Sequence, residues 1–374
     1  MSKLVESLNK FGFETLHATN PNNKTENAVF SPFSAFICVA MSTPIFQNET
    51  RAEILKSLQI SSDGAQIEPI LQKLHEFIKK EDTDNVSSSN RIWANQSINF
   101  NPKTFELNQK VLEIPIDKVS FPQPACDIIN EDVNKKTKGM IPKLVEPSDL
   151  SPDTAIVLLN AIYFKSDWEK KFEIDPTSYS PKVNNFTLAD GTQIHANMIR
   201  SLDRKLPYAE NGRFQAVSIP YLNNQYDFVI VLPKKGAEEG YNDLTKLTYN
   251  ILNNELLSRM RNQKVNIRLP KFTIESKIKL NDVFKSLGME KAFSQSADCT
   301  DPSVKYYVNS IIQKAKIIVD ENGTVAAAAT GMSINALSIE TTYDIFADHP
   351  FAYLLRNRQT GSILFEGFVK NPSA

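Results

Sequence analysis

The chain carries few side chains whose types and spacing could support catalysis or metal binding. Its four histidines are His17, His75, His195 and His349. None of them lies at the spacing of a metal site or of a catalytic triad, and the GxSxG, HExxH, GxxxxGK[ST] and GxGxxG motifs do not occur. We therefore expect no catalytic residue, no metal site and no cofactor.

The three cysteines are compatible with a reducing environment. Cys38, Cys126 and Cys299 are isolated and show no CxxC spacing, so neither a disulfide framework nor a zinc site is indicated. Cys38 lies in the apolar stretch 35–41, which is typical of a buried thiol. The first residues contain no apolar run of signal-peptide length, and no run of about 18 apolar residues occurs anywhere. We expect a cytoplasmic protein, with release by a non-standard export route as the alternative.

The charges give no sign of a polyanionic partner. Lys and Arg number 42 and Asp and Glu number 43, which leaves a formal net charge of -1 over 374 residues. Nucleic acid and anionic membranes are therefore not expected partners. The region around Lys73, Lys79 and Lys80 is only weakly basic, so a polyanion activator is not expected either.

The most informative segment is the run 320–331, whose sequence is DENGTVAAAATG. The preceding stretch 311–319 is rich in Ile and Val and predicts a strand. The four alanines favour a helix by intrinsic propensity, yet they are also small enough to enter a packed sheet. If the segment were a strand, the side chains on one face would be Thr324, Ala326, Ala328 and Thr330, which are all small. Alone, the run fits a loop or short surface helix; its flanks favour a segment that changes secondary structure.

The elements around this segment alternate between helical and strand patterns. Helical periodicity occurs at 4–16, 32–41, 51–58, 67–78 and 280–287. Strand patterns occur at 90–94, 154–164, 217–221, 226–233, 265–272, 352–356 and 362–369. The continuous apolar run 154–164 predicts a central strand that is buried on both faces. No linker or repeat divides the chain, so we predict one mixed domain over residues 1–374.

Five separated motifs occur in an order that is specific to one family. They are NAVFSPFS at 27–34, NAIYFKSDW at 160–168, LPKF at 269–272, the hinge at 321–329 and DHPF at 348–351. With these motifs the chain resembles the serpins, from its first helix to Pro372. It is most similar to the intracellular-type inhibitory serpins that lack a signal peptide.

The resemblance implies a fold and a set of functional residues. The fold would be α+β, with three β-sheets, about nine α-helices and an exposed reactive-centre loop at about 321–346. The hinge residues would be Glu321, Gly323, Thr324, Val325, Ala326, Ala327, Ala328 and Ala329. The residues that control sheet opening would be Ser31, Ser34, Asn160, Trp168, Lys271 and Gln313, with an expected ion pair between Lys271 and Glu321. Gln313 replaces a histidine of many serpins, so pH dependence from that group is expected to be lost.

The resemblance also implies a mechanism. A target serine protease would cleave the loop, remain bound as a covalent acyl complex and be distorted when the loop inserts into the central sheet. Family spacing puts the reactive bond at Leu337 and Ser338, sixteen positions after Glu321, whereas counting back from Pro350 favours Ile339. No Arg or Lys lies between Gly323 and Pro350, so chymotrypsin-like or cathepsin-G-like proteases are the expected targets of a monomeric inhibitor. The alternative is a non-inhibitory serpin that acts as a chaperone, carrier or storage protein.

Overall fold

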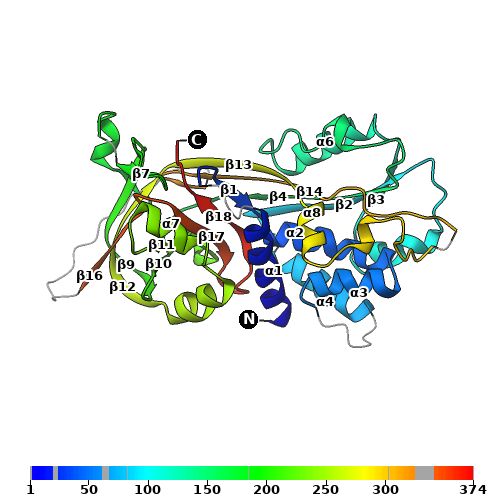
Figure 1. Ribbon diagram of the computed structural model, residues 1–374, viewed down its shortest axis with the longest axis horizontal. Coiled ribbons are helices and arrows are strands. Elements are labelled where there is room, and N and C mark those ends of the chain that lie inside the picture. The colour runs from blue at the N-terminus through cyan, green and yellow to red at the C-terminus, as the bar shows by residue number, and fades with distance from the viewer. Residues whose placement is uncertain are drawn as a thin grey trace. The chain divides into compact units, whose positions relative to one another are not determined.

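The chain divides into two units, and each is assembled from three separate segments. The structure, a computed structural model, describes residues 2–19, 24–60, 67–81, 83–183, 185–301, 303–324 and 341–373 (Figure 1). Unit 1 comprises Met1–Thr19, Phe30–Phe164 and Ser276–Lys316, and unit 2 comprises Asn20–Val29, Lys165–Glu275 and Ile317–Ala374. A single domain over residues 1–374 stays a prediction.

Unit 1 contains most of the described helices and a three-stranded sheet. Its helices are α1 (Lys3–Thr19), α2 (Pro32–Ser42), α3 (Asn48–Ser57), α4 (Ile67–Glu81), α5 (Glu106–Lys110), α6 (Ala125–Lys136) and α8 (Asn281–Ser286). Its sheet has the order β3-β2-β4, from β2 (Val86–Asn95), β3 (Ile116–Val119) and β4 (Ile156–Phe164). β2 pairs with β3 in parallel and with β4 in antiparallel orientation. The predicted helices and the central strand of this unit are confirmed.

β4 is buried on both faces, as its continuous apolar sequence predicts. Val157, Leu159 and Ala161 join residues of α6 in one buried cluster on one face. On the other face, the Cys38 thiol of α2 donates to the carbonyl of Leu158 at 3.4 Å. Figure 1 shows α6 and α2 on opposite sides of this sheet. Burial raises the pKa of the Cys38 thiol to about 12, so this group stays protonated and unreactive at neutral pH.

α2 owes its position to its sequence. The side chain of Ser31 caps the first turn by accepting from the backbone N–H of Ser34 at 3.2 Å, and Pro32 occupies the first helical position. Every residue of α2 is buried. An apolar sequence on all sides of a helix requires neighbours on all sides, and here those neighbours include α1 and β4.

The strands β13 (Phe272–Lys279) and β14 (Ile312–Val319) form a separate two-stranded sheet. Ile311, which directly precedes β14, forms an isolated parallel bridge with Leu158 of β4. In the described part of the chain, this bridge links β4 to the residue at which β14 begins.

Unit 2 is dominated by a nine-stranded sheet of order β1-β18-β17-β11-β10-β9-β12-β16, with β6 paired to β9. Its strands are β1 (Ala28–Phe30), β6 (Glu173–Ile174), β9 (Met198–Glu210), β10 (Phe214–Pro220), β11 (Tyr226–Pro233), β12 (Arg261–Pro270), β16 (Thr342–Phe346), β17 (Phe351–Asn357) and β18 (Ile363–Val369). The unit also contains α7 (Ala237–Leu244), the pair β7 (Phe186–Thr187) and β8 (Gln193–Ile194), and the pair β5 (Ser166–Asp167) and β15 (Gly323–Thr324). The predicted strand pair 217–233 and the C-terminal hairpin are confirmed.

The core of unit 2 contains charged groups beside its aromatic side chains. Asp227 is fully buried, and its carboxylate accepts two hydrogen bonds from the Arg356 guanidinium, both at 2.9 Å. The Ser218 hydroxyl donates a third at 2.6 Å. These partners satisfy a buried charge that would otherwise cost several kcal/mol.

Glu366 of β18 is buried without such partners. Its side chain is 0% exposed, and neither carboxylate oxygen has a hydrogen-bond partner among the described residues. It lies opposite Leu354 in the β17–β18 register. Burial raises the pKa of Glu366 well above its ordinary value, so the core holds this side chain as a neutral acid.

Candidate functional site

The predicted reactive-centre loop begins where β14 leads into β15. The Asp320 carboxylate accepts from the backbone N–H groups of Asn322 at 2.8 Å and of Gly323 at 3.1 Å, which closes a tight turn. β15 then pairs with β5 in antiparallel orientation, with Gly323 opposite Asp167. A Cβ atom on Gly323 would lie 2.4 Å from the carbonyl oxygen of Ser166, and the φ angle of Gly323 is +154°. Only glycine fits this close approach of two backbones.

Trp168 ties the end of β14 to the segment that follows β5. Its indole N–H donates to the carbonyl of Asp320 at 2.8 Å, and its backbone N–H donates to the carbonyl of Asn322 at 2.9 Å. The ring is 2% exposed and stacks on Tyr221 with centroids 4.5 Å apart. Trp168 therefore fixes the start of the loop through both backbone and side chain.

Lys271 and Glu321 form the predicted ion pair, with 2.6 Å between Nζ and Oε2. Burial raises the pKa of the Glu321 carboxyl, but the hydrogen bond and the charge of Lys271 outweigh burial and lower the pKa overall. The pair is partly exposed, so its contribution to stability is about 0–1 kcal/mol. The backbone N–H of Phe172 donates to the carbonyl of Glu321 at 2.9 Å and adds a second anchor.

A second group of predicted residues lies in unit 1, beneath β4. The side-chain amide of Gln313 makes two hydrogen bonds with the backbone of Ser31: it donates to the carbonyl at 2.9 Å and accepts from the N–H at 2.8 Å. Ser31, Ser34 and Gln313 are 0%, 1% and 3% exposed. The same serine thus caps α2 and holds Gln313 of β14, which couples this helix to β14.

The structure brings together two of the predicted groups and leaves the rest outside its description. Trp168, Lys271, Glu321 and Gly323 meet in unit 2, and Ser31, Ser34 and Gln313 meet in unit 1. The backbone of Asn160 in β4 pairs with that of Asn90 in β2, but the side chain of Asn160 is not described, and the same holds for the side chain of Thr324. The remaining predicted loop residues lie outside the described residues: Val325, Ala326, Ala327, Ala328, Ala329, Leu337, Ser338 and Ile339.

Sequence reasoning missed several residues that position the loop. Asp320 and Phe172 form hydrogen bonds with the hinge region, and Tyr221 stacks on Trp168, which anchors the start of the loop. The Asp-x-Asn-Gly order at 320–323 is a turn signal that could have indicated the role of Asp320. Stacking of Trp168 on Tyr221 has no such signal, because the two residues are brought together only by the fold.

Comparisons with known proteins decide the family. A model of the family described as serpin (serine protease inhibitor) matches residues 6–372. The chain belongs to the serpin family. Members of this family are mostly protease inhibitors. This serpin is 32% identical to neuroserpin of Gallus gallus, over 93% of this chain and 87% of the relative. It is 30% identical to leukocyte elastase inhibitor of Xenopus laevis, over the full length of both.

Solved structures show the same fold. The thermophilic serpin tengpin in its native state superposes with a TM-score of 0.83 at 26% identity, over 99% of this chain and 95% of that one. The predicted α+β serpin fold is therefore confirmed. None of the helices in the described ranges is long and apolar enough to cross a membrane. Within the same ranges, no three His, Cys, Asp or Glu side chains form a group that could hold a metal ion.

Proposed function

We propose that this serpin inhibits serine endopeptidases of chymotrypsin-like or cathepsin-G-like specificity as a suicide substrate. The protease serine attacks the carbonyl of Leu337, and the amine of Ser338 leaves, so that an acyl ester joins inhibitor and enzyme. The freed segment from Thr324 onward then inserts as a new strand between β14 and β4, and so becomes part of the central sheet that contains β4. This movement distorts the bound protease before water can hydrolyse the ester.

The observation that carries the proposal is the way in which β14 leads into the loop. Gly323 and Thr324 are held against β5, which follows β4 after one residue. The loop therefore starts at the end of the strand that it would join. The bridge from Ile311 to Leu158 lies on the edge of β4 that faces β14. An inserted strand would pair with this edge and replace the bridge.

The composition of the hinge supports insertion on energetic grounds. A new strand would gain on the order of ten ladder hydrogen bonds, worth about 0.5–1.5 kcal/mol each. A bulky or charged inward side chain would cancel that gain. The side chains on the inward face would be Thr324, Ala326, Ala328 and Thr330, which add neither bulk nor charge.

The specificity proposal rests on the sequence of the loop. Leu337 would fill an apolar primary pocket, and Ile339 is the alternative residue. Digestion with chymotrypsin followed by mass spectrometry of the released peptides identifies the cleaved bond directly. A Leu337→Arg variant should lose activity against chymotrypsin and gain it against trypsin, whereas an unchanged profile would reassign the bond.

A panel experiment tests the inhibitory function. The protein is incubated with chymotrypsin, cathepsin G, elastase and trypsin, and the products are separated on a denaturing gel. We expect a covalent complex with chymotrypsin or cathepsin G and none with trypsin. Cleavage of the loop without any complex, and without a rise in melting temperature after cleavage, would favour the non-inhibitory alternative.

The remaining proposals concern the state and place of action. We expect a monomer in solution, which size-exclusion chromatography with light scattering checks. A cytoplasmic location is consistent with Cys38, Cys126 and Cys299, which are all buried as free thiols. Fractionation of source cells with an antibody against the protein checks this location.

A further inference from the structure

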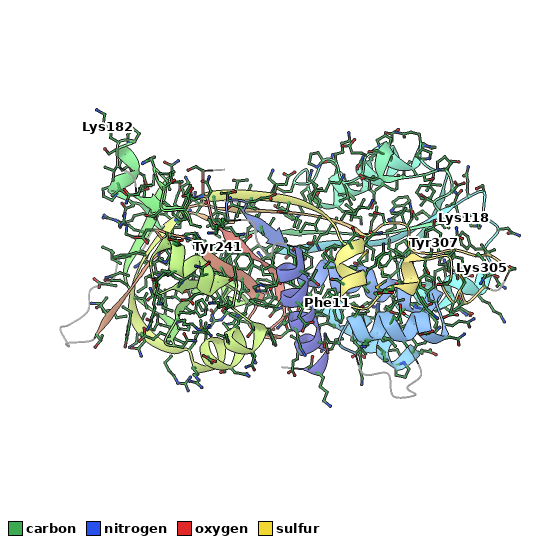
Figure 2. The ribbon with its side chains drawn as sticks, viewed as in Figure 1. Phe11, Lys118, Lys182, Tyr241, Lys305 and Tyr307 are labelled. Atoms are coloured by element: carbon green, nitrogen blue, oxygen red, sulfur yellow. The ribbon has the colours of Figure 1, made fainter. Side chains whose placement is uncertain are left out.

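An exposed apolar tip projects from unit 2 between β6 and β7. It comprises residues 176–183, and we call it the β6–β7 tip. Tyr179 is 73% exposed, the highest fraction among the exposed large apolar side chains of the described chain, and Val183 is 39% exposed. Lys182 is exposed and points outward from the tip (Figure 2). Tyr179 and Val183 thus bring two exposed apolar side chains together on one short segment, and exposed apolar side chains that gather in a patch mark contact surfaces.

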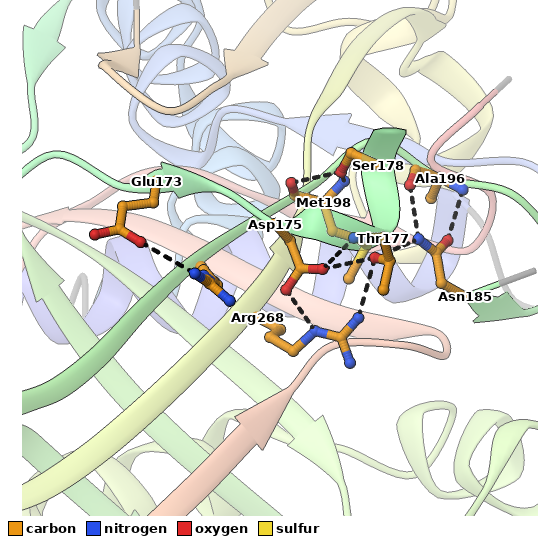
Figure 3. Close-up of polar contacts among 9 residues, drawn as sticks. Glu173, Asp175, Thr177, Ser178, Asn185, Ala196, Met198 and Arg268 are labelled. Carbon is orange, nitrogen blue, oxygen red and sulfur yellow. Dashed lines mark hydrogen bonds and ion pairs between the residues drawn. The ribbon is translucent and has the colours of Figure 1, made fainter. Parts of the chain in front are cut away.

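A dense set of hydrogen bonds holds the base of the tip in place (Figure 3). The Asp175 carboxylate accepts from the backbone N–H of Thr177 at 2.9 Å and from Nε of Arg268 at 3.1 Å. The side chain of Asn185 donates to the Thr177 hydroxyl at 3.0 Å, and the Ser178 hydroxyl donates to the carbonyl of Met198 at 2.8 Å. The base has many fixed contacts, while Tyr179 has solvent around it. Such preorganisation lowers the entropy lost when a partner binds.

The segments that flank the tip in sequence contact the regions where the proposed reactive loop begins and ends. On its N-terminal side, Phe172 bonds to Glu321, where the loop begins, and Lys171 Nζ donates to the side chain of Asn322 at 3.1 Å. On its C-terminal side, the backbone N–H of Thr187 donates to the carbonyl of Asp348, just after the loop returns into β16.

Arg268 adds a direct connection from the tip to the strand that follows the loop. Its guanidinium bonds to Asp175 and Thr177 and also lies over the ring of Phe346 in β16, 5.6 Å from the centroid. The backbone carbonyl of Arg268 accepts from the N–H of Ala347 at 2.9 Å. The base of the tip and the strand that follows the loop are therefore fixed to each other.

We infer that the β6–β7 tip is a second contact surface for the target protease, outside the protease active site. This inference rests on the inhibitory function proposed above. A protease domain of about 230 residues has a radius of gyration of about 17 Å, so an enzyme seated on a short loop also covers the surface around both loop ends. The protease surface that fits the tip is apolar, to receive Tyr179 and Val183, and carries a carboxylate opposite Lys182.

The test compares inhibition rates of the double variant Tyr179→Ser/Val183→Ser with those of the parent. Tyr307→Ser is the matched control, because Tyr307 is 37% exposed but lies in unit 1, outside the tip. We expect the double variant to inhibit chymotrypsin or cathepsin G about tenfold more slowly, the loss typical of truncating interface anchors. Its stoichiometry of inhibition and melting temperature should match those of the parent, and the control should be unchanged.

A charge variant examines the second element of the surface. Lys182→Glu should slow inhibition of the same protease, and the slowing should weaken at high salt because the contact is exposed. Rates for the double variant within about twofold of the parent, for every protease that the parent inhibits, would overturn the inference. A change in stoichiometry at an unchanged rate would also overturn it, since the tip would then affect loop insertion instead of docking. A parent protein that inhibits no protease would overturn the proposed function, and the inference with it. A parent that inhibits a protease at the same rate as the double variant would overturn the inference alone.

Discussion

Glu366 offers a quantitative prediction about stability, because a buried carboxyl without a partner must be kept protonated. Its folded pKa is raised and its unfolded pKa is about 4.3, so the folded state binds one proton more than the unfolded state between these two values. The free energy of unfolding therefore falls as the pH rises above about 4.3, because the unfolded state releases the Glu366 proton and the folded state keeps it. Keeping the acid neutral costs about 1.36 kcal/mol for each pH unit between the unfolded pKa and the folded pKa, which at pH 7 amounts to at most about 3.7 kcal/mol.

The substitution Glu366→Gln removes this cost while it keeps the size and the polarity of a neutral acid. We expect the free energy of unfolding to rise by up to about 3.7 kcal/mol at pH 7 and to be almost unchanged near pH 4. Urea denaturation, followed by tryptophan fluorescence at several pH values between 5 and 8, measures the difference. Glu76→Gln in α4 is the control, because Glu76 is exposed and the same chemical change should leave stability and its pH dependence unaltered.

The slope with pH carries the test. The parent should lose stability with rising pH more steeply than the Glu366→Gln variant, by about 1.36 kcal/mol per pH unit while the acid remains protonated only in the folded state. Parallel pH profiles for the two proteins would refute the reasoning. In that case the carboxyl would have to be ionised and solvated or paired in the folded protein.

Three further predictions concern the proposed switch. Thr324→Arg should leave the loop cleavable but turn the inhibitor into a substrate, because insertion would bury a charge; an undiminished covalent complex on a denaturing gel would contradict this. Gln313→Leu should lower the free energy of unfolding by about 1–3 kcal/mol, because the buried N–H of Ser31 loses the Gln313 acceptor, whereas the Ser31 carbonyl still accepts from the N–H of Ala35; an unchanged urea midpoint would contradict this. Trp168→Phe removes the bond to Asp320 and should cost about 1–3 kcal/mol, measured by calorimetry, whereas an unchanged melting temperature would show that the bond is replaced by water.

The elements that depend on local sequence could be predicted, and those that depend on long-range packing could not. Ser31 and Pro32 mark the start of α2 by their capping chemistry alone. The apolar run at 154–164 predicts a strand that is buried on both faces, because strands covered on both sides read as continuous apolar runs without alternation. By contrast, nothing in the sequence around Glu366 indicates that a carboxyl enters the core of unit 2.

The hinge shows the same limit at the candidate site. Its small residues predict a segment that can join a sheet, and Gly323 indeed lies where a Cβ atom would collide with the backbone. The pairing of Lys271 with Glu321 followed from the family resemblance. The contributions of Tyr221 and Phe172 did not, because their roles arise from tertiary proximity to Trp168 and Glu321. The substitution of histidine by Gln313 predicted only a lost titration, whereas the amide in fact makes two bonds to Ser31.

The Gln313 amide makes one contact of the proposed switch independent of pH. An amide neither gains nor loses a proton across the acidity range of a cell, so its grip on the Ser31 backbone is the same in the cytosol and in an acidified vesicle. The two hydrogen bonds that hold β14 to Ser31 are therefore equally strong in every compartment. Under the proposed function, this contact therefore offers the same resistance to loop insertion in every compartment where the protein meets its protease.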